Sequence, residues 1–506
     1  WRAAARAAAA AGRHREEAAF QARAAEAFAR CGDAAARFEA LCDEVDACVR
    51  ADLGAESLAR AAALWALAAD DAQRLRALRH HIDLLGNRGQ PAEAIQRAQA
   101  AFALLDTLSA HGGTQAPALA EHVRIGSAVV ACHLHLMQRD EAVAVLDRLL
   151  GRLAASGLPL AAPEQQLLAN AQANVAWISG RLREAAAHFE QAAAQAAALG
   201  QGANVATSWN NIATCWARLG LNEPAADAAE RSWRVRRSGE PGTGLVQQTA
   251  VTLARARRDQ GRFAEALALY EDACTEFGRS GAHLWRHVAE MGLATTWARL
   301  GQGARARPRL HTDDEAAPPH LRAQRRLARG DLLVLMGGDA RPWLDEAWAV
   351  LRELPPHAPG AALVWLQGRD PGEVWAEATR IATEAHAADL GGVAQAARVR
   401  QAEAALALGR ATEAEAAAAA ALALLDEGRH PEGFGLPRVW WVAARAAQAA
   451  GRPHEAARRA AAGVRWLRDV ALPHVAPPFI EAFLTRHPVH RALLALQQAL
   501  PVGDAP

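Results

Sequence analysis

Histidine and carboxylate pairs are the residues in this sequence whose spacing could support metal binding or acid–base chemistry. His283 and His287 are four residues apart, so one helix face could present both imidazoles to a metal ion, but no third ligand has a defined relation to them. Asp70-Asp71 and Asp313-Asp314 are interpreted as solvated residues at a helix end and in a loop. The sequence therefore predicts no metal site and no cofactor.

No nucleophile stands in a recognisable catalytic context. The sequence has no Gly-x-Ser-x-Gly motif, no His-Glu-x-x-His motif, and no CxxC pair among its six cysteines. All 56 basic residues are Arg, so the lysine that a Walker phosphate loop or a Schiff-base enzyme needs is missing. We therefore expect no enzymatic activity and buried thiols in a reducing, cytoplasmic compartment.

The charge and hydropathy of the chain limit its partners. The chain has 56 basic and 55 acidic residues and therefore a net charge of +1. This charge creates no global field that would attract nucleic acid or an anionic membrane. No apolar run reaches the length of a membrane-spanning helix without a charge. We expect no direct nucleic-acid binding and no membrane association.

A regular repeat of helix pairs must position whatever site exists. The glycines Gly180, Gly220, Gly261 and Gly301 follow one another at nearly equal spacing, and each ends one helical pattern and begins the next. Ala, Leu, Arg and Glu fill the intervals, and no alternating β-branched run predicts a sheet. A fixed period with two helices predicts an all-α solenoid of antiparallel helix pairs.

The regularity of this pattern varies along the chain. A helical stretch from Leu53 to Leu85 is predicted to stop at Gly86-Asn-Arg-Gly89, a C-terminal cap followed by a turn. The predicted segments are an N-terminal helical part of the array (1–85), repeats (86–310), an irregular helical repeat with loops (311–360), further repeats (361–470), and C-terminal capping helices with a tail (471–506).

The central copies resemble tetratricopeptide repeats. Small residues would let the two helices of a pair approach closely, and an aromatic ring would fill the gap to the next pair. The matching residues are Trp209, Ile212, Ala213 and Trp216 before one turn, and Ala185, Phe189, Ala192, Ala266, Tyr270 and Ala273 after two others. The resemblance implies a right-handed superhelix, with Phe189 and Tyr270 buried between helix pairs.

The spacing of the turn glycines is longer than the period of about 34 residues that is usual for tetratricopeptide repeats. The array therefore resembles the longer variant at the C-terminal end of bacterial signal-transduction ATPases and transcriptional activators. The segments Trp1–Ala18 and Phe479–His490 resemble parts of that group, and a chain that begins at Trp1 is expected to be a piece of a longer protein. The resemblance implies a sensor or interaction region of a regulator. The alternative is a constitutive scaffold for protein assembly, and a Walker loop encoded before Trp1 would favour the regulator.

In tetratricopeptide arrays the first helix of each pair lines a concave groove, which implies binding positions on four successive helices. Amide and guanidinium groups there could bind a peptide or protein, an acidic partner, or a small anionic effector, but could equally be polar residues facing water. The positions are Asn170, Asn174 and Trp177, then Asn210, Asn211, Thr214 and Arg218, then Gln248, Arg255 and Arg258, then Thr295 and Arg299. The four arginines are predicted to form a positive stripe whose compensating acids lie elsewhere.

Overall fold

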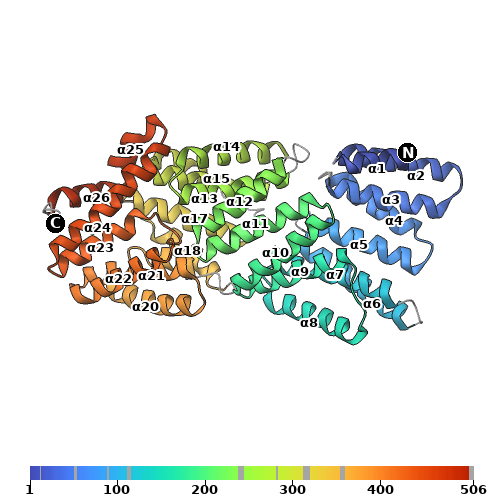
Figure 1. Ribbon diagram of the computed structural model, residues 1–506, viewed down its shortest axis with the longest axis horizontal. Coiled ribbons are helices and arrows are strands. Elements are labelled where there is room, and N and C mark those ends of the chain that lie inside the picture. The colour runs from blue at the N-terminus through green and yellow to red at the C-terminus, as the bar shows by residue number, and fades with distance from the viewer. Residues whose placement is uncertain are drawn as a thin grey trace. The chain divides into compact units, whose positions relative to one another are not determined.

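The computed structural model describes residues 1–11, 13–50, 54–87, 90–110, 115–237, 244–280, 283–310, 319–353 and 359–500. Within these residues 85% are helical and no β-strand forms, which confirms the predicted all-α solenoid of antiparallel helix pairs (Figure 1). Local chemistry explains this, because Ala, Leu, Arg and Glu lose little side-chain entropy in a helix.

The chain divides into two compact units. Unit 1 comprises Trp1–Trp209 with Arg234–Thr243, and unit 2 comprises Asn210–Trp233 with Gly244–Pro506. The division passes through α11 (Gly202–Arg218) and α12 (Asn222–Arg237), within the segment predicted as repeats 86–310.

Unit 1 is built from successive helices along the chain. Consecutive helices pack on one another, as α9 does on α10 and α2 does on α3. The helices are α1 (Arg2–Ala10), α2 (His14–Arg30), α3 (Ala34–Arg50), α4 (Gly54–Leu67), α5 (Asp71–Asn87), α6 (Pro91–Ala110), α7 (Gln115–His135), α8 (Arg139–Ser156), α9 (Ala162–Ile178) and α10 (Leu182–Ala198).

Unit 2 continues this succession of helices and ends in shorter elements. Its helices are α13 (Gly244–Asp259), α14 (Phe263–Ser280), α15 (His283–Arg299), α16 (Gly303–Leu310), α17 (Pro319–Leu335), α18 (Arg341–Leu351), α19 (Pro359–Trp365), α20 (Pro371–Ala387), α21 (Gly391–Ala407), α22 (Ala411–Asp426), α23 (Pro437–Ala449), α24 (Pro453–Arg465), α25 (Ile480–Thr485) and α26 (Pro488–Ala499). A π-helix (Trp466–Ala471) and two 3₁₀ turns (Leu472–His474 and Pro477–Phe479) connect α24 to α25.

The turns at Gly180, Gly220, Gly261 and Gly301 are Schellman caps. At Gly180, φ is +77°, the Gly180 N–H bonds to the Trp177 carbonyl at 3.0 Å, and the Arg181 N–H bonds to the Ala176 carbonyl at 2.9 Å. The same two bonds recur at Gly220, Gly261 and Gly301. Glycine suits this left-handed position because it has no Cβ.

Two turns depart from what the glycine pattern predicts. Met137 takes the left-handed position between α7 and α8 with φ of +57°, so a non-glycine residue completes that cap. In the predicted capping segment Gly86-Asn-Arg-Gly89, Gly86 still lies inside α5, which ends at Asn87, and the last two residues lie outside the described residues. A Cβ on Gly86 would lie 3.3 Å from the Cys132 sulfur, so this glycine allows α5 and α7 to pack closely.

The aromatic residue after the turn is buried, as predicted for both copies. Phe189 and Tyr270 each expose only 2% of their surface. The Tyr270 ring lies against Gly292 of α15, where any Cβ would clash with it. Small residues in the first helix of one pair therefore make room for the ring of the preceding pair.

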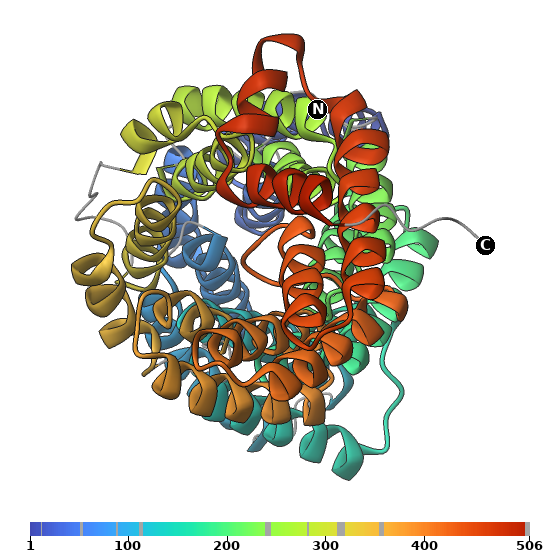
Figure 2. The ribbon, with the colours of Figure 1, turned by 90° about the vertical axis from the view of Figure 1, so that its left-hand side faces the viewer.

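Unit 2 also closes on itself along a line that we call the seam. The turn glycines Gly220, Gly261 and Gly301 of three successive pairs contact segments from the C-terminal part of the unit. A Cβ on Gly220 would lie 2.6 Å from the backbone nitrogen of Gly392, and one on Gly261 would lie 3.1 Å from the Trp466 ring. Figure 2 shows the C-terminal helices of this unit (red) beside the helices of its first repeats (green).

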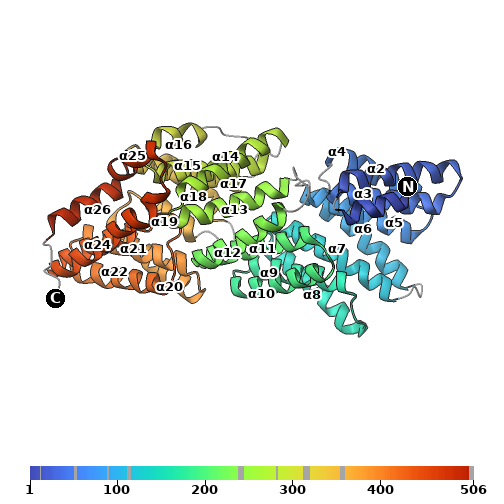
Figure 3. The ribbon, with the colours of Figure 1, turned by 45° about the horizontal axis from the view of Figure 1, so that its top comes forward.

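Aromatic side chains make the hydrophobic core continuous across the seam. Phe263 at the start of α14 lies 5.6 Å from Phe483 of α25, and Trp297 of α15 meets Phe479 edge-on at 4.9 Å between ring centroids. The Arg305 guanidinium lies 5.2 Å from the ring centroids of both Trp297 and Phe479. Figure 3 shows α25 beside α15 and α16 accordingly.

Candidate functional site

The predicted groove residues lie on the first helices of four successive pairs, as the repeat pattern requires. Asn170, Asn174 and Trp177 belong to α9 in unit 1, where Asn174 is buried and the other two are half-buried. The remaining nine residues lie on α11, α13 and α15 in unit 2. Their binding role stays a prediction.

The α11 and α13 positions differ in their surroundings. Asn210, Asn211, Thr214 and Arg218 are half-buried on α11, and the Thr214 hydroxyl donates to the Asn210 carbonyl at 3.1 Å, a local helix bond. On α13, Gln248 is half-buried and Arg255 is exposed.

Arg258 and Arg299 hold the same carboxylate. Arg258 Nε and Nη2 donate to the two oxygens of Asp259 at 3.0 and 3.2 Å, and Arg299 Nη1 donates to Asp259 Oδ1 at 2.7 Å. Burial alone would raise the pKa of Asp259, but the two guanidinium groups hold it well below its usual value. The prediction that the compensating acids lie elsewhere is therefore wrong for these two arginines, because Asp259 lies between them.

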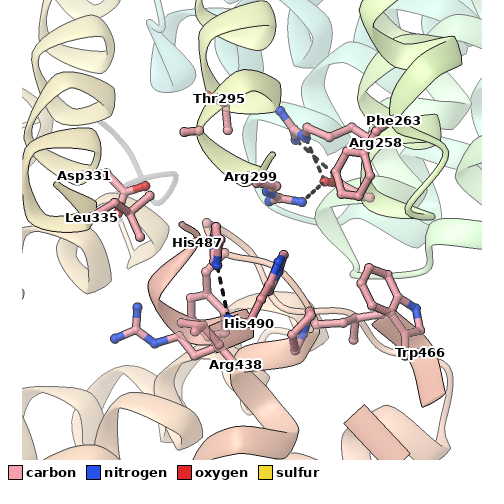
Figure 4. A pocket seen from close by; sticks show the side chains of 18 residues that line it. Arg258, Phe263, Thr295, Arg299, Asp331, Leu335, Arg438, Trp466, His487 and His490 are labelled. Carbon is pink, nitrogen blue, oxygen red and sulfur yellow. Dashed lines mark hydrogen bonds and ion pairs between the residues drawn. The ribbon is translucent and has the colours of Figure 1, made fainter. Parts of the chain in front are cut away.

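A pocket opens beside this cluster, at the seam. It has a volume of about 60 Å³, and four of its lining residues, Arg258, Asp259, Thr295 and Arg299, come from α13 and α15 (Figure 4). By volume it has room for a few water molecules or one small polar group. The other lining residues include Phe263, Asp331, Leu335, Phe434, Leu436, Arg438, Trp466, His487, Val489 and His490.

Arg438 of α23 provides a third guanidinium group from the far side of the pocket. Its Nε and Nη2 donate to Glu403 at 2.7 and 2.9 Å, and Arg400 Nη1 donates to the same carboxylate at 3.2 Å. Burial lowers the pKa of Arg400 to about 10, and the positive charge of Arg438 adds to that effect. The carboxylate of Asp331 accepts an N–H bond from Gln367 at 2.8 Å.

His487 and His490 form a stacked pair that faces the Arg–Asp cluster, with ring centroids 3.9 Å apart. His490 Nδ1 donates to the Phe483 carbonyl at 2.8 Å, and His487 Nδ1 accepts the His490 backbone N–H at 3.4 Å as the N-cap of α26. Burial lowers the pKa of His490 to about 4, and the charge of Arg299 adds to this. Burial also places the pKa of His487 well below its usual value, so both rings are neutral near pH 7.

The charged groups that line the pocket do not balance when Glu403 and Arg400, which a chain of ion pairs joins to the lining residue Arg438, are counted with them. Within the described residues four are guanidinium groups and three are carboxylates, so one positive charge remains while the histidines are neutral. The guanidinium groups belong to Arg258, Arg299, Arg400 and Arg438, and the carboxylates to Asp259, Asp331 and Glu403.

Sequence reasoning found Arg258, Thr295 and Arg299 but missed the opposite wall. Arg438, His487 and His490 come much later in the sequence, and no repeat position marks them. The segment Phe479–His490 had a family resemblance but no assigned role. The only available signal was two histidines three residues apart at a helix start, which by itself does not indicate a binding site.

The residues first considered for chemistry have structural roles where the structure describes them. His287 Nδ1 contacts the Arg325 guanidinium. Asp70 accepts the Gln73 N–H at 2.8 Å as a cap of α5, which confirms the helix-end interpretation. Asp313 and Asp314 lie outside the described residues. Five cysteines are buried as predicted, but Cys31 is exposed, because it follows the last residue of α2 at a turn.

A search of the described helices for a stretch long and apolar enough to cross a bilayer finds none.

Comparisons with known proteins support the fold. No protein family model matches the chain, and no curated protein sequence matches it. A crystal structure of a Rap protein complexed with competence and sporulation factor has a TM-score of 0.55 at 11% identity, over 71% of this chain and 99% of that chain. The Rap conjugation gene regulator of plasmid pLS20 with the Phr* peptide scores 0.48 at 12% identity, over 69% and 94%. NprR with its cognate peptide NprX scores 0.49 at 11% identity, over 65% and 94%. The likeness to the first of these structures supports the tetratricopeptide-like fold of this chain.

Proposed function

We propose that this chain is a non-enzymatic binding array, and that unit 2 receives a peptide or a small ligand with an anionic group at the seam pocket. The single observation that carries the proposal is the convergence of three guanidinium groups on one partly enclosed pocket in an otherwise nearly neutral protein. Charge-assisted N–H bonds from arginine favour an anionic acceptor and contribute about 1.5–3 kcal/mol each when well formed.

The position of the pocket suggests how binding would be transmitted. Its walls come from the central pairs and from the C-terminal helices of one unit, so a bound ligand would contact both sides of the seam. A ligand that binds the closed seam better than an open one shifts the unit towards the closed state. This behaviour suits the sensor region of a bacterial transcriptional or signalling regulator, and the Rap structure of similar fold also holds a bound factor.

The experiment is an affinity selection with two pools of candidates, random hexapeptides and small organic acids. Each pool is incubated with the full chain, the complex is isolated by size exclusion, and the bound molecules are identified by mass spectrometry. The wild type is compared with Arg299→Gln in the pocket and with Arg410→Gln, whose side chain is exposed at the start of α22.

We expect enriched molecules that carry a carboxylate or another anionic group. Their enrichment should fall at least tenfold with Arg299→Gln and remain with Arg410→Gln. The proposal fails if no molecule is enriched from either pool, or if the same molecules are enriched equally by both variants.

A further inference from the structure

We infer that the seam pocket binds the carboxylate of its ligand together with one proton, which the side chain of His490 takes up. This inference rests on the proposed function and specifies the ligand chemistry and the regulation of the same pocket.

The charge balance selects an anion of one negative charge. The cluster around the pocket carries four guanidinium groups and three carboxylates, so a carboxylate would bring its total charge to zero. Asp259 does not repel such a ligand strongly, because Arg258 and Arg299 already compensate its charge. A dianion would leave one negative charge without compensation in a partly enclosed site, which is unfavourable.

The shape of the pocket suits a carboxylate on an apolar group. The void of about 60 Å³ is too small for a large ligand but has room for one carboxylate. Phe263, Leu335, Phe434 and Trp466 border it and provide an apolar surface for the rest of the ligand. The pocket therefore combines a small polar end with an apolar wall, as ligand sites commonly do.

The hydrogen bonds of the histidine pair determine where a proton can go. The carbonyl of Phe483 can only accept, so His490 Nδ1 carries a hydrogen and Nε2 is its basic atom. His487 Nδ1 accepts the N-cap bond of α26, so protonation there would remove the cap. His490 Nε2 is thus the site that can gain a proton without the loss of a hydrogen bond.

The charges around His490 explain why the proton would arrive with the ligand. Arg299 from α15 and Arg438 from α23 act on the histidine pair, and Arg258 with Asp259 from α13 and Asp331 from α17 line the same pocket. The surplus of positive charge disfavours imidazolium in the empty pocket. A carboxylate cancels that surplus, so it makes protonation of His490 more favourable, and by linkage a proton makes carboxylate binding more favourable.

The experiment uses 3-phenylpropionate as the probe, with its neutral amide, 3-phenylpropanamide, as the matched control. Binding to the full chain is measured by isothermal titration calorimetry at pH 6 and pH 8, where the carboxylate stays ionised, and in two buffers of different ionisation enthalpy to count the protons taken up. We expect the acid to bind at least tenfold more tightly than the amide at pH 6, with affinity at least fivefold higher at pH 6 than at pH 8. A fraction of a proton should be taken up per bound acid at pH 6.

Variants locate the proton. His490→Asn retains a side-chain N–H near the Phe483 carbonyl but cannot titrate, so proton uptake should vanish and the affinities at pH 6 and pH 8 should converge. His454→Asn, at an exposed histidine of α24, should behave as wild type. If His490→Asn does not fold, the proton count for the wild type still decides, because the inference requires uptake.

Several results would overturn the inference. Equal affinity for the acid and the amide would show that the pocket does not select an anion. Equal affinity for the acid at both pH values would show that no proton is taken up on binding. Tighter binding of phenyl phosphate than of 3-phenylpropionate at pH 8 would show that the pocket prefers a phosphate group to a carboxylate. If the peptide or acid pool still yields Arg299-dependent ligands while 3-phenylpropionate fails, the proposed function stands and this inference alone is wrong.

Discussion

Arg429 donates from Nη1 to the backbone carbonyl of Leu219 at 2.7 Å, although 210 residues separate the two in the sequence. Next to this bond, the His430 N–H donates to the Gly220 carbonyl at 2.8 Å, and Arg429 Nη2 binds Asp389 at 2.9 Å. The turn between α11 and α12 is thus attached to the loop between α22 and α23. An open solenoid has contacts only between neighbouring repeats, whereas the seam adds contacts between distant ones.

The seam can be tested by two glycines with the same backbone conformation. Gly301 and Gly409 both have φ of +71°, but a Cβ on Gly301 would clash with the Ala482 carbonyl, whereas one on Gly409 would meet no atom within 4 Å. We expect Gly409→Ala to lower the free energy of unfolding by about 1–2 kcal/mol from backbone strain. Gly301→Ala should lower it by about 1–3 kcal/mol more, because the seam must shift. Urea denaturation followed by circular dichroism measures both, and equal losses would argue against a closed seam.

The shared carboxylate predicts different effects for two neighbouring arginines. Arg258 is only 10% exposed and bonds to Asp259 through two nitrogens, whereas Arg255 is exposed. Arg258→Gln should therefore lower the free energy of unfolding by about 1.5–3 kcal/mol. Arg255→Gln should change it by less than about 0.5 kcal/mol. Denaturant titration of the two variants measures these changes. If Arg258→Gln left the free energy of unfolding unchanged, the ion pair between Arg258 and Asp259 would not form in solution.

The neutral histidine pair predicts a loss of stability in acid. The pKa of His490 is about 4 in the folded chain and about 6.5 when unfolded, so the unfolded state binds more protons between these values. Its contribution is fully present above pH 6.5 and is lost as the pH falls towards 4, by about 3 kcal/mol in total. The difference between wild type and His490→Asn, measured by denaturant titration from pH 7.5 to pH 4.5, should therefore shrink as the pH falls. A constant difference would show that His490 does not stay neutral in the fold.

The two buried aromatic residues predict how far a local defect spreads. Phe189→Ala and Tyr270→Ala should each cost about 3–5 kcal/mol, because they leave cavities between helix pairs. In unit 1, hydrogen exchange after Phe189→Ala should rise in neighbouring helices and fade with distance. In unit 2, exchange after Tyr270→Ala should also rise in α25 and α26, since the same core cluster contains Tyr270, Phe483 and Leu493. Exchange that rises only in α13–α16 would indicate that the seam contributes little stability.

Much of the local structure followed from the sequence because its causes are local. A helix forms from bonds four residues apart, and the Schellman cap needs only one residue that tolerates a positive φ, so the glycines at 180, 220, 261 and 301 predicted their turns. The buried positions of Phe189 and Tyr270 followed from the same period. Gly86 and Met137 depart from the glycine pattern because the left-handed position is a property of the backbone, and glycine alone does not prove it.

The tertiary structure alone decided where the candidate site lies. Whether a solenoid closes depends on small rotations between helix pairs, which add up over many repeats. Local sequence patterns do not predict the total rotation. That sum brings His487 next to Gly301 and places Arg438 and His490 across a pocket from Arg258 and Arg299. The sequence identified one wall of this pocket from its period, and the second wall exists only because unit 2 closes.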